Sequence, residues 1–168
     1  MTAQTAKTVN AANATKTTKS ADTADYKAEN EGWFVNVDEA FAESQKTDKP
    51  ILANFTGSDW CGWCKRLTAS VFIQEDFQKW AEDNVVLLEL DFPRRKTVPT
   101  EIRQQNAGLK NAFKVTGFPT VWVFDLEKDE GGKFNISAYG KTGYTKTPKE
   151  FTAGVDQMLT KRGKEKVE

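Results

Sequence analysis

The chain has 168 residues with 24 basic and 24 acidic side chains, so its formal net charge is zero. That length suits one domain with a tail better than two domains. A balanced charge gives no general attraction to nucleic acid or to an anionic membrane surface. No apolar run approaches the roughly 20 residues that a membrane-spanning helix needs. The sequence therefore predicts no nucleic-acid partner and no membrane span.

The absence of two residue patterns narrows the chemistry further. The sequence contains no histidine, which excludes Ser-His and Cys-His nucleophile pairs and every histidine-ligated metal site. Its two cysteines are Cys61 and Cys64, and the next residue is Lys65 rather than the histidine of a c-type haem attachment site. One cysteine pair cannot complete a four-thiolate zinc site without a second chain. We expect neither a metal nor a cofactor.

Composition divides the chain into three parts. Residues 1–30 are mostly Thr, Ala, Lys, Asn, Ser and Asp without hydrophobic periodicity, which predicts a disordered tail. This tail lacks the apolar core of a signal peptide. It fits an exported chain whose signal has been removed, and a plain polar tail is the alternative. Residues 31–162 have the pattern of a packed domain, and residues 163–168 form a short charged tail.

Within the domain, apolar patterning predicts helices and strands in alternation. A short helix capped by Asp38 precedes a strand over 51–56, and a second helix begins near Cys61 and carries apolar residues at helical spacing to Ala81. A buried strand over 85–91 follows, and Pro99 suits the first turn of a third helix that reaches about 113. Strands over 120–124 and 134–139 form a hairpin, and a last helix includes residues 151–159.

This order of elements predicts an α/β fold with a central mixed β-sheet flanked by helices on both faces. Strands that alternate with helices indicate parallel pairing through crossover connections, and the final hairpin would add an antiparallel strand. The basic loop 92–96 after the second strand is interpreted as solvated rather than as a docking patch.

The Cys61-Gly62-Trp63-Cys64 segment is the strongest chemical signal. It follows a buried strand and a Gly-Ser-Asp turn, and it opens a helix. Residues three apart lie on one helical face, which allows one turn to close or open a disulfide. Unpaired N–H groups and the helix dipole at this end favour the thiolate, the attacking species. We predict Cys61 as the nucleophile and Cys64 as the resolving thiol.

Four side chains around the pair have two interpretations each. Lys65 and Arg66 oppose the helix dipole, so helix stability does not explain them. Their functional interpretation is thiolate stabilisation or substrate docking, and a solvated basic edge is the alternative. Trp60 and Trp63 flank the nucleophile in a short turn where burying both would be difficult. At least one of them is predicted to be an exposed apolar platform for polypeptide substrates, and plain packing is the alternative.

The segment from Asn54 to Lys65 resembles the active-site segment of the thioredoxin superfamily, with its W-C-G-x-C-K core. Downstream, Val115-Thr116-Gly117-Phe118-Pro119-Thr120 resembles the V-x-G-x-P-T segment of the same superfamily. Bacterial extracytoplasmic proteins of the disulfide-interchange type show the closest resemblance. The resemblance covers residues 31–161 and implies a thioredoxin-like fold, a protein disulfide oxidoreductase activity and a location outside the cytoplasm, with the cytoplasm as the alternative.

The same resemblance implies roles for individual residues. Pro119 would form a cis peptide bond that faces the dithiol and leaves neighbouring backbone groups free to pair with a substrate strand. Together with Trp60, Gly62, Trp63 and Phe118, it would form the substrate-binding surface. Independently of the resemblance, the positive charges of Lys65 and Arg66 are predicted to modulate the pKa of the nucleophile.

Two positions depart from the thioredoxin pattern. Trp63 stands where thioredoxin has proline, so the reduction potential need not match that of thioredoxin. Asn54 stands near the position of a buried aspartate that is thought to relay a proton to the resolving cysteine. Glu89 and Asp91 on the next strand are possible substitutes, although a solvated strand end is favoured for both, and no relay residue is assigned.

Disulfide exchange with cysteine-containing protein substrates is the leading hypothesis, with reductase favoured over isomerase and oxidase. A monomer is expected, recharged by an upstream reductase that the sequence does not identify. A binding or chaperone module with a structural or regulatory disulfide is the second hypothesis. A Cu(I) carrier that uses both thiolates is the third.

Overall fold

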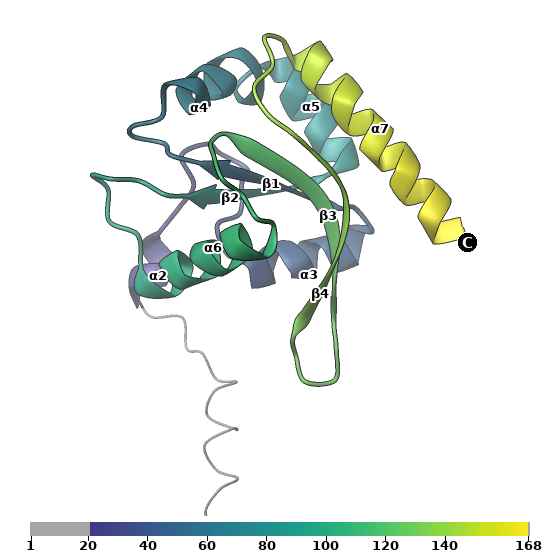
Figure 1. Ribbon diagram of the computed structural model, residues 1–168, viewed down its shortest axis with the longest axis horizontal. Coiled ribbons are helices and arrows are strands. Elements are labelled where there is room, and N and C mark those ends of the chain that lie inside the picture. Colours follow the sequence, from purple (N-terminus) through teal and green to yellow (C-terminus); the bar gives the residue numbers. More distant parts are fainter. Residues whose placement is uncertain (1–20, 168) are drawn as a thin grey trace, which may run out of the picture.

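The computed structural model describes residues 21–167, which form a four-stranded mixed sheet in the order β2-β1-β3-β4 with helices on both faces (Figure 1). β1 is central, and all six of its residues are buried because it pairs with β2 on one side and β3 on the other. The strands are β1 (Ile51–Thr56), β2 (Val86–Asp91), β3 (Thr120–Lys128) and β4 (Phe134–Thr142). The helices are α2 (Ala21–Asp25), α3 (Val37–Thr47), α4 (Gly62–Leu67), α5 (Glu75–Asn84), α6 (Thr100–Ala112) and α7 (Pro148–Val167), with a π-helical turn η1 (Thr68–Phe72) after α4.

The alternation of side chains along β1 divides the core into two apolar clusters. Ala53 and Phe55 point to the face covered by α3 and α6, where they pack with residues such as Phe113. Leu52 points to the opposite face, which α4, α5 and α7 cover, and there it packs with residues such as Phe77. The predicted arrangement, a mixed sheet between two helical layers, is confirmed.

The direction of β3 differs from the prediction. β1 and β2 are parallel, but β3 runs antiparallel to β1 and β4 antiparallel to β3. Thr120, the first residue of β3, lies opposite Phe55 near the carboxyl end of β1. The loop after β2 and α6 therefore return the chain to the end of the sheet from which it left, and β3 must run back. Alternation of strands and helices does not reveal such a return.

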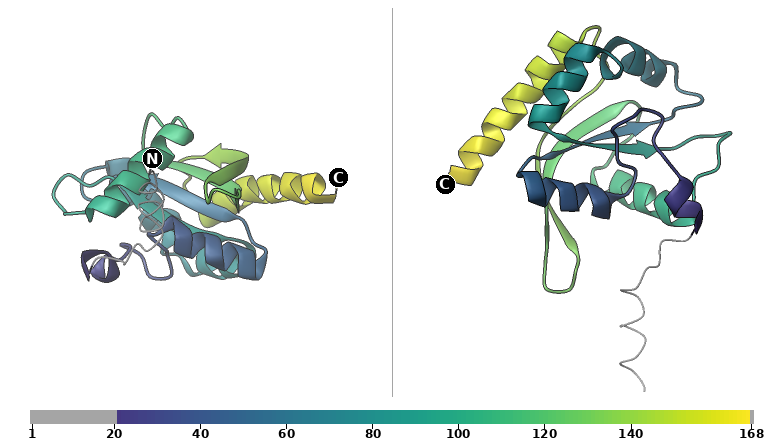
Figure 2. Two further views of the ribbon diagram at one scale, coloured as in Figure 1. Left: turned by 90° about the horizontal axis from the view of Figure 1, so that it is seen from below. Right: turned by 180° about the vertical axis from the view of Figure 1, so that it is seen from behind.

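Both ends of the packed region extend beyond the predicted boundaries. Residues 1–20 lie outside the described residues, so their predicted disorder stays a prediction. Residues 21–30, however, include α2 and a segment that contacts the domain, and Phe34 then pairs with Leu88 at the β2 edge (Figure 2, right). At the other end, α7 continues to Val167 through most of the predicted tail.

Two helix starts and breaks also differ in detail. Asn36, rather than Asp38, caps α3, because its side chain accepts the backbone N–H groups of Asp38 and Glu39. The helix that begins after Cys61 does not continue unbroken to Ala81 but passes through η1 before α5 starts at Glu75.

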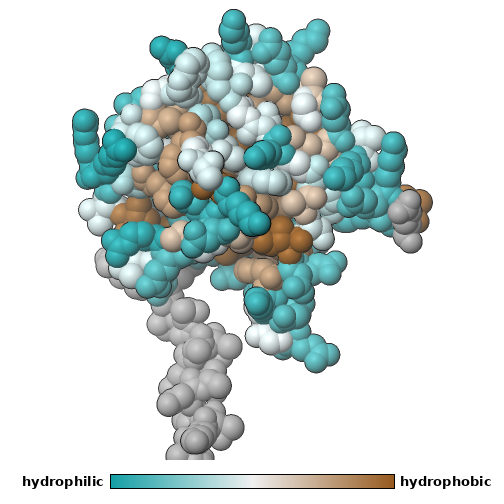
Figure 3. Space-filling model, in the orientation of Figure 1, coloured by the Kyte–Doolittle hydropathy of each residue, from teal (hydrophilic) through white to brown (hydrophobic). Residues whose placement is uncertain are grey.

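Hydrophilic side chains border the face shown in Figure 3, and apolar surface is visible nearer its centre. Within residues 21–167 no helix is both long and apolar enough to cross a membrane.

Candidate active site

The cysteine pair lies where β1 ends and α4 begins. Cys61 is the N-cap residue of α4 and forms a disulfide with Cys64, with 5.2 Å between their Cα atoms. The backbone N–H of Cys64 donates to Cys61 Sγ at 3.2 Å. A hydrogen bond of this kind favours negative charge on the sulfur. Cys61 is 7% exposed and Cys64 is 3% exposed, so the predicted nucleophile is the more accessible of the two.

Trp60 is held firmly at the side of Cys61. Its indole Nε1 donates to the carbonyl oxygen of Phe92 at 2.8 Å, and the guanidinium of Arg94 lies 4.0 Å from the ring centroid. The ring of Phe118 meets it edge to face, with 5.8 Å between centroids. A side chain at Gly57 would overlap this indole, so the turn requires glycine there. Trp60 is a half-buried part of the framework rather than a free platform.

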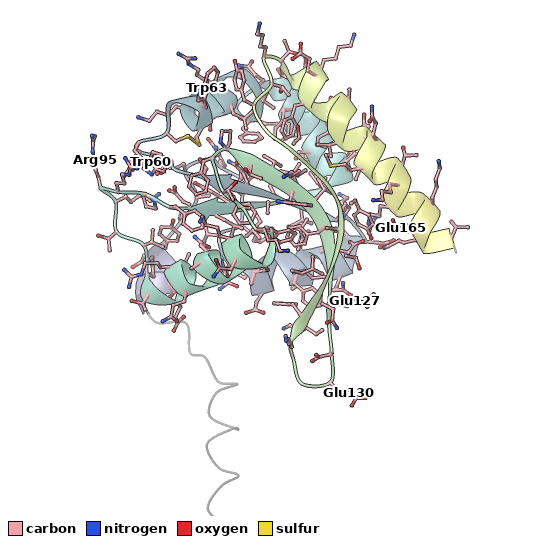
Figure 4. The ribbon with its side chains drawn as sticks, in the orientation of Figure 1. Trp60, Trp63, Arg95, Glu127, Glu130 and Glu165 are labelled. Carbon is pink, nitrogen blue, oxygen red and sulfur yellow. A yellow bond between two sulfur atoms is a disulfide. The ribbon has the colours of Figure 1, made fainter. Side chains whose placement is uncertain are left out.

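Asp59 fastens the turn before the cysteines to the loop after β2. Its carboxylate accepts the backbone N–H groups of Arg94, Arg95 and Lys96 at 2.9, 2.7 and 3.0 Å. These hydrogen bonds, first of all the one from Arg94, hold the pKa of Asp59 below its ordinary value. The loop that the sequence suggested was simply solvated is therefore fixed beside Trp60, with Arg95 projecting from it (Figure 4).

Trp63 has the opposite character. Its side chain is 53% exposed, and it contacts Tyr144 with 5.0 Å between ring centroids. The guanidinium of Arg66 lies 4.7 Å from its ring centroid. In Figure 4 the disulfide lies between the labelled Trp63 and Trp60. Gly62, Lys65 and Arg66 are also exposed on this turn of helix.

Phe118 and Pro119 join this site from the strand β3 side. The Phe118–Pro119 peptide bond is cis. Phe118 stacks on Phe92 with 5.3 Å between centroids, in addition to its contact with Trp60. The two segments that the sequence analysis singled out are thus brought together through aromatic contacts, and both Phe118 and Pro119 remain partly exposed.

Glu89 and Asp91 are buried, and the preference for a solvated strand end is wrong for both. Glu89 is 5% exposed and Asp91 is 2% exposed. Both lie on the α4 face of the sheet, because Glu89 pairs in register with Asn54 and Asp91 with Thr56. Asp91 accepts hydrogen bonds from the backbone N–H and the hydroxyl of Ser58. Burial raises the pKa of Glu89 to about 7.

The N-terminal segment covers these acids. The backbone N–H of Glu29 donates to Glu89 Oε2 at 2.7 Å, and the Glu29 carboxylate pairs with Lys96 at 2.6 Å. Lys96 also lies 3.4 Å from Asp91. Tyr26 lies beside this group, with Lys96 Nζ 5.3 Å from its ring centroid. Among residues 21–167, no three side chains of Cys, Asp, Glu or His gather as they would to hold a metal ion.

Comparisons with known proteins agree with this geometry. A family model described as a thioredoxin-like domain matches residues 37–159. The chain belongs to the thioredoxin-like domain family. It is 36% identical over 106 residues to the disulfide bond reductase DsbH of Chlamydia pneumoniae, a match that covers 63% of this chain and 64% of that protein.

Further similarities support the same family. The chain is 30% identical over 108 residues to the thioredoxin-related protein DsbJ of Chlamydia pneumoniae, which covers 64% of this chain and 30% of DsbJ. It thus spans less than two thirds of the length of either curated relative. A solved structure described as DsbH oxidoreductase superposes with a TM-score of 0.65 and 28% identity, covering 80% of this chain and 92% of that one.

For a thioredoxin-like protein, the framework around the dithiol contains residues that motif reasoning did not single out. Asp59, Phe92 and Arg94 fix the turn that leads to Cys61, and Tyr144 contacts Trp63. The role of Asp59 could have been predicted from the sequence, because an aspartate in a turn commonly accepts hydrogen bonds from backbone N–H groups. Tyr144 gave no such signal, since its contact with Trp63 spans 81 positions and depends on the tertiary fold.

Proposed function

We propose that this protein exchanges disulfides with cysteine-containing proteins through Cys61 and Cys64, and that it acts as a reductase. The observation that carries the proposal is the N-cap position of Cys61, with its sulfur accepting the Cys64 backbone N–H. The name of the DsbH relative, a disulfide bond reductase, supports the direction. A chain with only these two cysteines also avoids mispairing with itself.

The reaction follows from the two positions. In the reduced protein, the Cys61 thiolate attacks one sulfur of a substrate disulfide, and the other substrate sulfur leaves as a thiolate that takes up a proton. Cys64 then loses its proton and attacks Cys61, which releases the second substrate thiol and forms the Cys61–Cys64 disulfide. Two electrons pass to the substrate, and an upstream dithiol donor must return them.

The surface around the disulfide supports a polypeptide substrate. Trp63, half exposed, and the partly exposed Phe118 and Pro119 provide apolar contacts on either side of the cysteines. Gly62 leaves room for a substrate chain above the helix start, since a Cβ there would meet no atom within 4 Å. Lys65 and Arg66 place positive charge near Cys61 and would stabilise its thiolate in the reduced protein. The protein would act as a monomer outside the cytoplasm, as the resemblance to disulfide-interchange proteins suggests.

Equilibration of the Cys61–Cys64 pair against glutathione and dithiothreitol buffers tests the direction. A reduction potential near that of thioredoxin, about −270 mV, is expected for a reductase. A value above about −180 mV would instead indicate an oxidase or isomerase. Cys64→Ser should trap mixed disulfides with substrate proteins through Cys61, whereas Cys61→Ser should trap none.

The burial of both sulfurs favours one second candidate, a binding module with a structural disulfide. Turnover distinguishes the two. A binding module would show no catalysed reduction of a peptide disulfide by dithiothreitol, and its double Cys→Ser variant would retain partner binding. An exchange enzyme would lose its activity in that variant.

A further inference from the structure

A cavity of about 210 Å³ lies beside Cys64, on the side of the helix that faces the sheet. Its lining includes Cys64, Asn54, Glu89, Lys65 and Thr68. Asn54 and Glu89 are register partners on parallel neighbouring strands, so their side chains share one face. The Cys64 thiol and a carboxyl group therefore border the same cavity.

This cavity has the size and polarity to hold water. One water molecule occupies about 30 Å³ in the liquid and needs two to four polar partners. The buried Oδ1 of Asn54 has no hydrogen-bond partner among the described residues and is available as one of them. The carboxylate of Glu89 and the hydroxyl of Thr68 supply others. A short chain of water molecules would join Glu89 to Cys64.

We propose that Glu89 accepts the proton of the Cys64 thiol, through water in this cavity, when Cys64 resolves the mixed disulfide. The proposal rests on the proposed exchange function. The proton passes from Cys64 Sγ to the Glu89 carboxylate, and the Cys64 thiolate forms its bond with Cys61 Sγ. The bond between Cys61 and the substrate sulfur breaks with its electron pair on the substrate. Glu89 later returns the proton to solvent.

Asp91 is a poorer acceptor than Glu89, although it lies on the same strand. Ser58 donates to both of its carboxylate oxygens, and Lys96 Nζ lies 3.4 Å away. Asp91 also does not line the cavity. Asn54, the register partner of Glu89, also lines the cavity, but its amide cannot accept a proton as a carboxylate does.

The charges around Glu89 suit this task. Tyr26, Glu29, Asp91 and Lys96 face it from the N-terminal segment, its own strand and the loop after β2. Lys65 faces the same cavity from α4. Burial is the largest influence and raises the pKa of Glu89 to about 7, which the hydrogen bond from Glu29 and the charge of Lys96 partly oppose. An acceptor with a pKa near the working pH is the most effective general base.

The test follows the two attacks separately. The fully reduced protein is mixed in a stopped-flow instrument with a symmetrical aromatic disulfide, dithiobis(nitrobenzoate), which releases one coloured thiolate per attack. The first release reports Cys61 and the second reports Cys64, and Cys64→Ser identifies the phases because it should show the first alone. In Glu89→Gln we expect the second phase to slow roughly tenfold or more between pH 6 and 8, while the first phase keeps its rate.

Rescue separates proton transfer from support of the fold. Asn54→Asp in the Glu89→Gln background places a carboxylate on the neighbouring strand, on the same face and lining the same cavity, and should restore the second phase. An unchanged second phase in Glu89→Gln would overturn the proposal, and so would a slow phase that Asn54→Asp does not restore. Absence of the first phase in the unmodified protein would instead overturn the proposed exchange function itself.

Discussion

Glu89 gives the sharpest stability prediction, because it is a carboxyl group buried without a full complement of charge partners. Burial raises its pKa from 4.5 to about 7 in the folded protein. At about 1.4 kcal/mol per pKa unit, that rise corresponds to about 3 kcal/mol. This is a large share of the 5–15 kcal/mol by which a typical domain is stable, roughly a fifth to three fifths.

The sign follows from proton binding. Between pH 4.5 and about 7 the folded state binds a proton at Glu89 that the unfolded state has already lost. The stabilising contribution is therefore complete below pH 4.5 and is lost as the pH rises through about 7. Glutamine has nearly the same shape, its side-chain oxygen can still accept the Glu29 backbone N–H, and it never ionises. Glu89→Gln should match the unmodified protein near pH 4.5 and exceed its stability by about 3 kcal/mol at pH 8.

Urea unfolding of the oxidised protein, followed by tryptophan fluorescence at pH 5, 6, 7 and 8, measures this difference. Subtracting the unfolding free energy of the unmodified protein from that of Glu89→Gln at each pH cancels the contribution of other titrating groups. Asp59 is one of these, and because its pKa is lowered it titrates at more acidic pH. Glu130→Gln, at the exposed tip of the β3–β4 hairpin, is the matched control and should show no pH-dependent difference (Figure 4). A difference for Glu89→Gln that stays constant from pH 5 to 8 would refute the reasoning.

Three further predictions concern the framework of the site. Trp63→Ala should raise the KM for a peptide disulfide with little change in Tm, because its side chain is 53% exposed. Trp60→Ala should instead lower the free energy of unfolding, measured with urea, by roughly 2–3 kcal/mol. Equal losses of Tm in the two variants would contradict this contrast. Asp59→Ala should free the loop 92–96 and speed its cleavage by trypsin, while Asp59→Asn should retain part of the protection. Gly57→Ala should displace the Trp60 indole and shift its fluorescence, and an unchanged spectrum would show that the turn adapts.

Local sequence patterns predicted the elements of this fold well, because each element carries its own apolar period. The strand Ile51–Thr56 has the predicted bounds, and the helix that begins after Cys61 starts where its turn residues indicated. The direction of β3 was not predictable in this way. It depends on where α6 returns the chain relative to β1, and that is a property of the whole sheet.

The same limit explains why the N-terminal segment and the buried acids were misjudged. Residues 21–30 are polar, and nothing in their pattern predicts packing. Their contacts come from Glu29 with Glu89 and Lys96, and from Tyr26 beside Lys96, groups that are at least 60 positions away in the sequence. Glu89 and Asp91 alternate with leucines on a strand that was predicted to be buried on both faces, so their burial could have been inferred from that prediction.

A carboxyl group lies on each side of the cysteine pair, and the two groups have opposite environments. Asp59, on the Cys61 side, accepts hydrogen bonds from three backbone N–H groups that lower its pKa, so it stays ionised and holds the turn before Cys61 in place. Glu89, on the Cys64 side, is buried with a raised pKa, so it can gain and lose a proton near neutral pH. When environments push the pKa values of two carboxyl groups apart, their roles separate as well. Here the fixed charge suits a structural anchor, and the titrating group suits the proposed proton exchange with the Cys64 thiol.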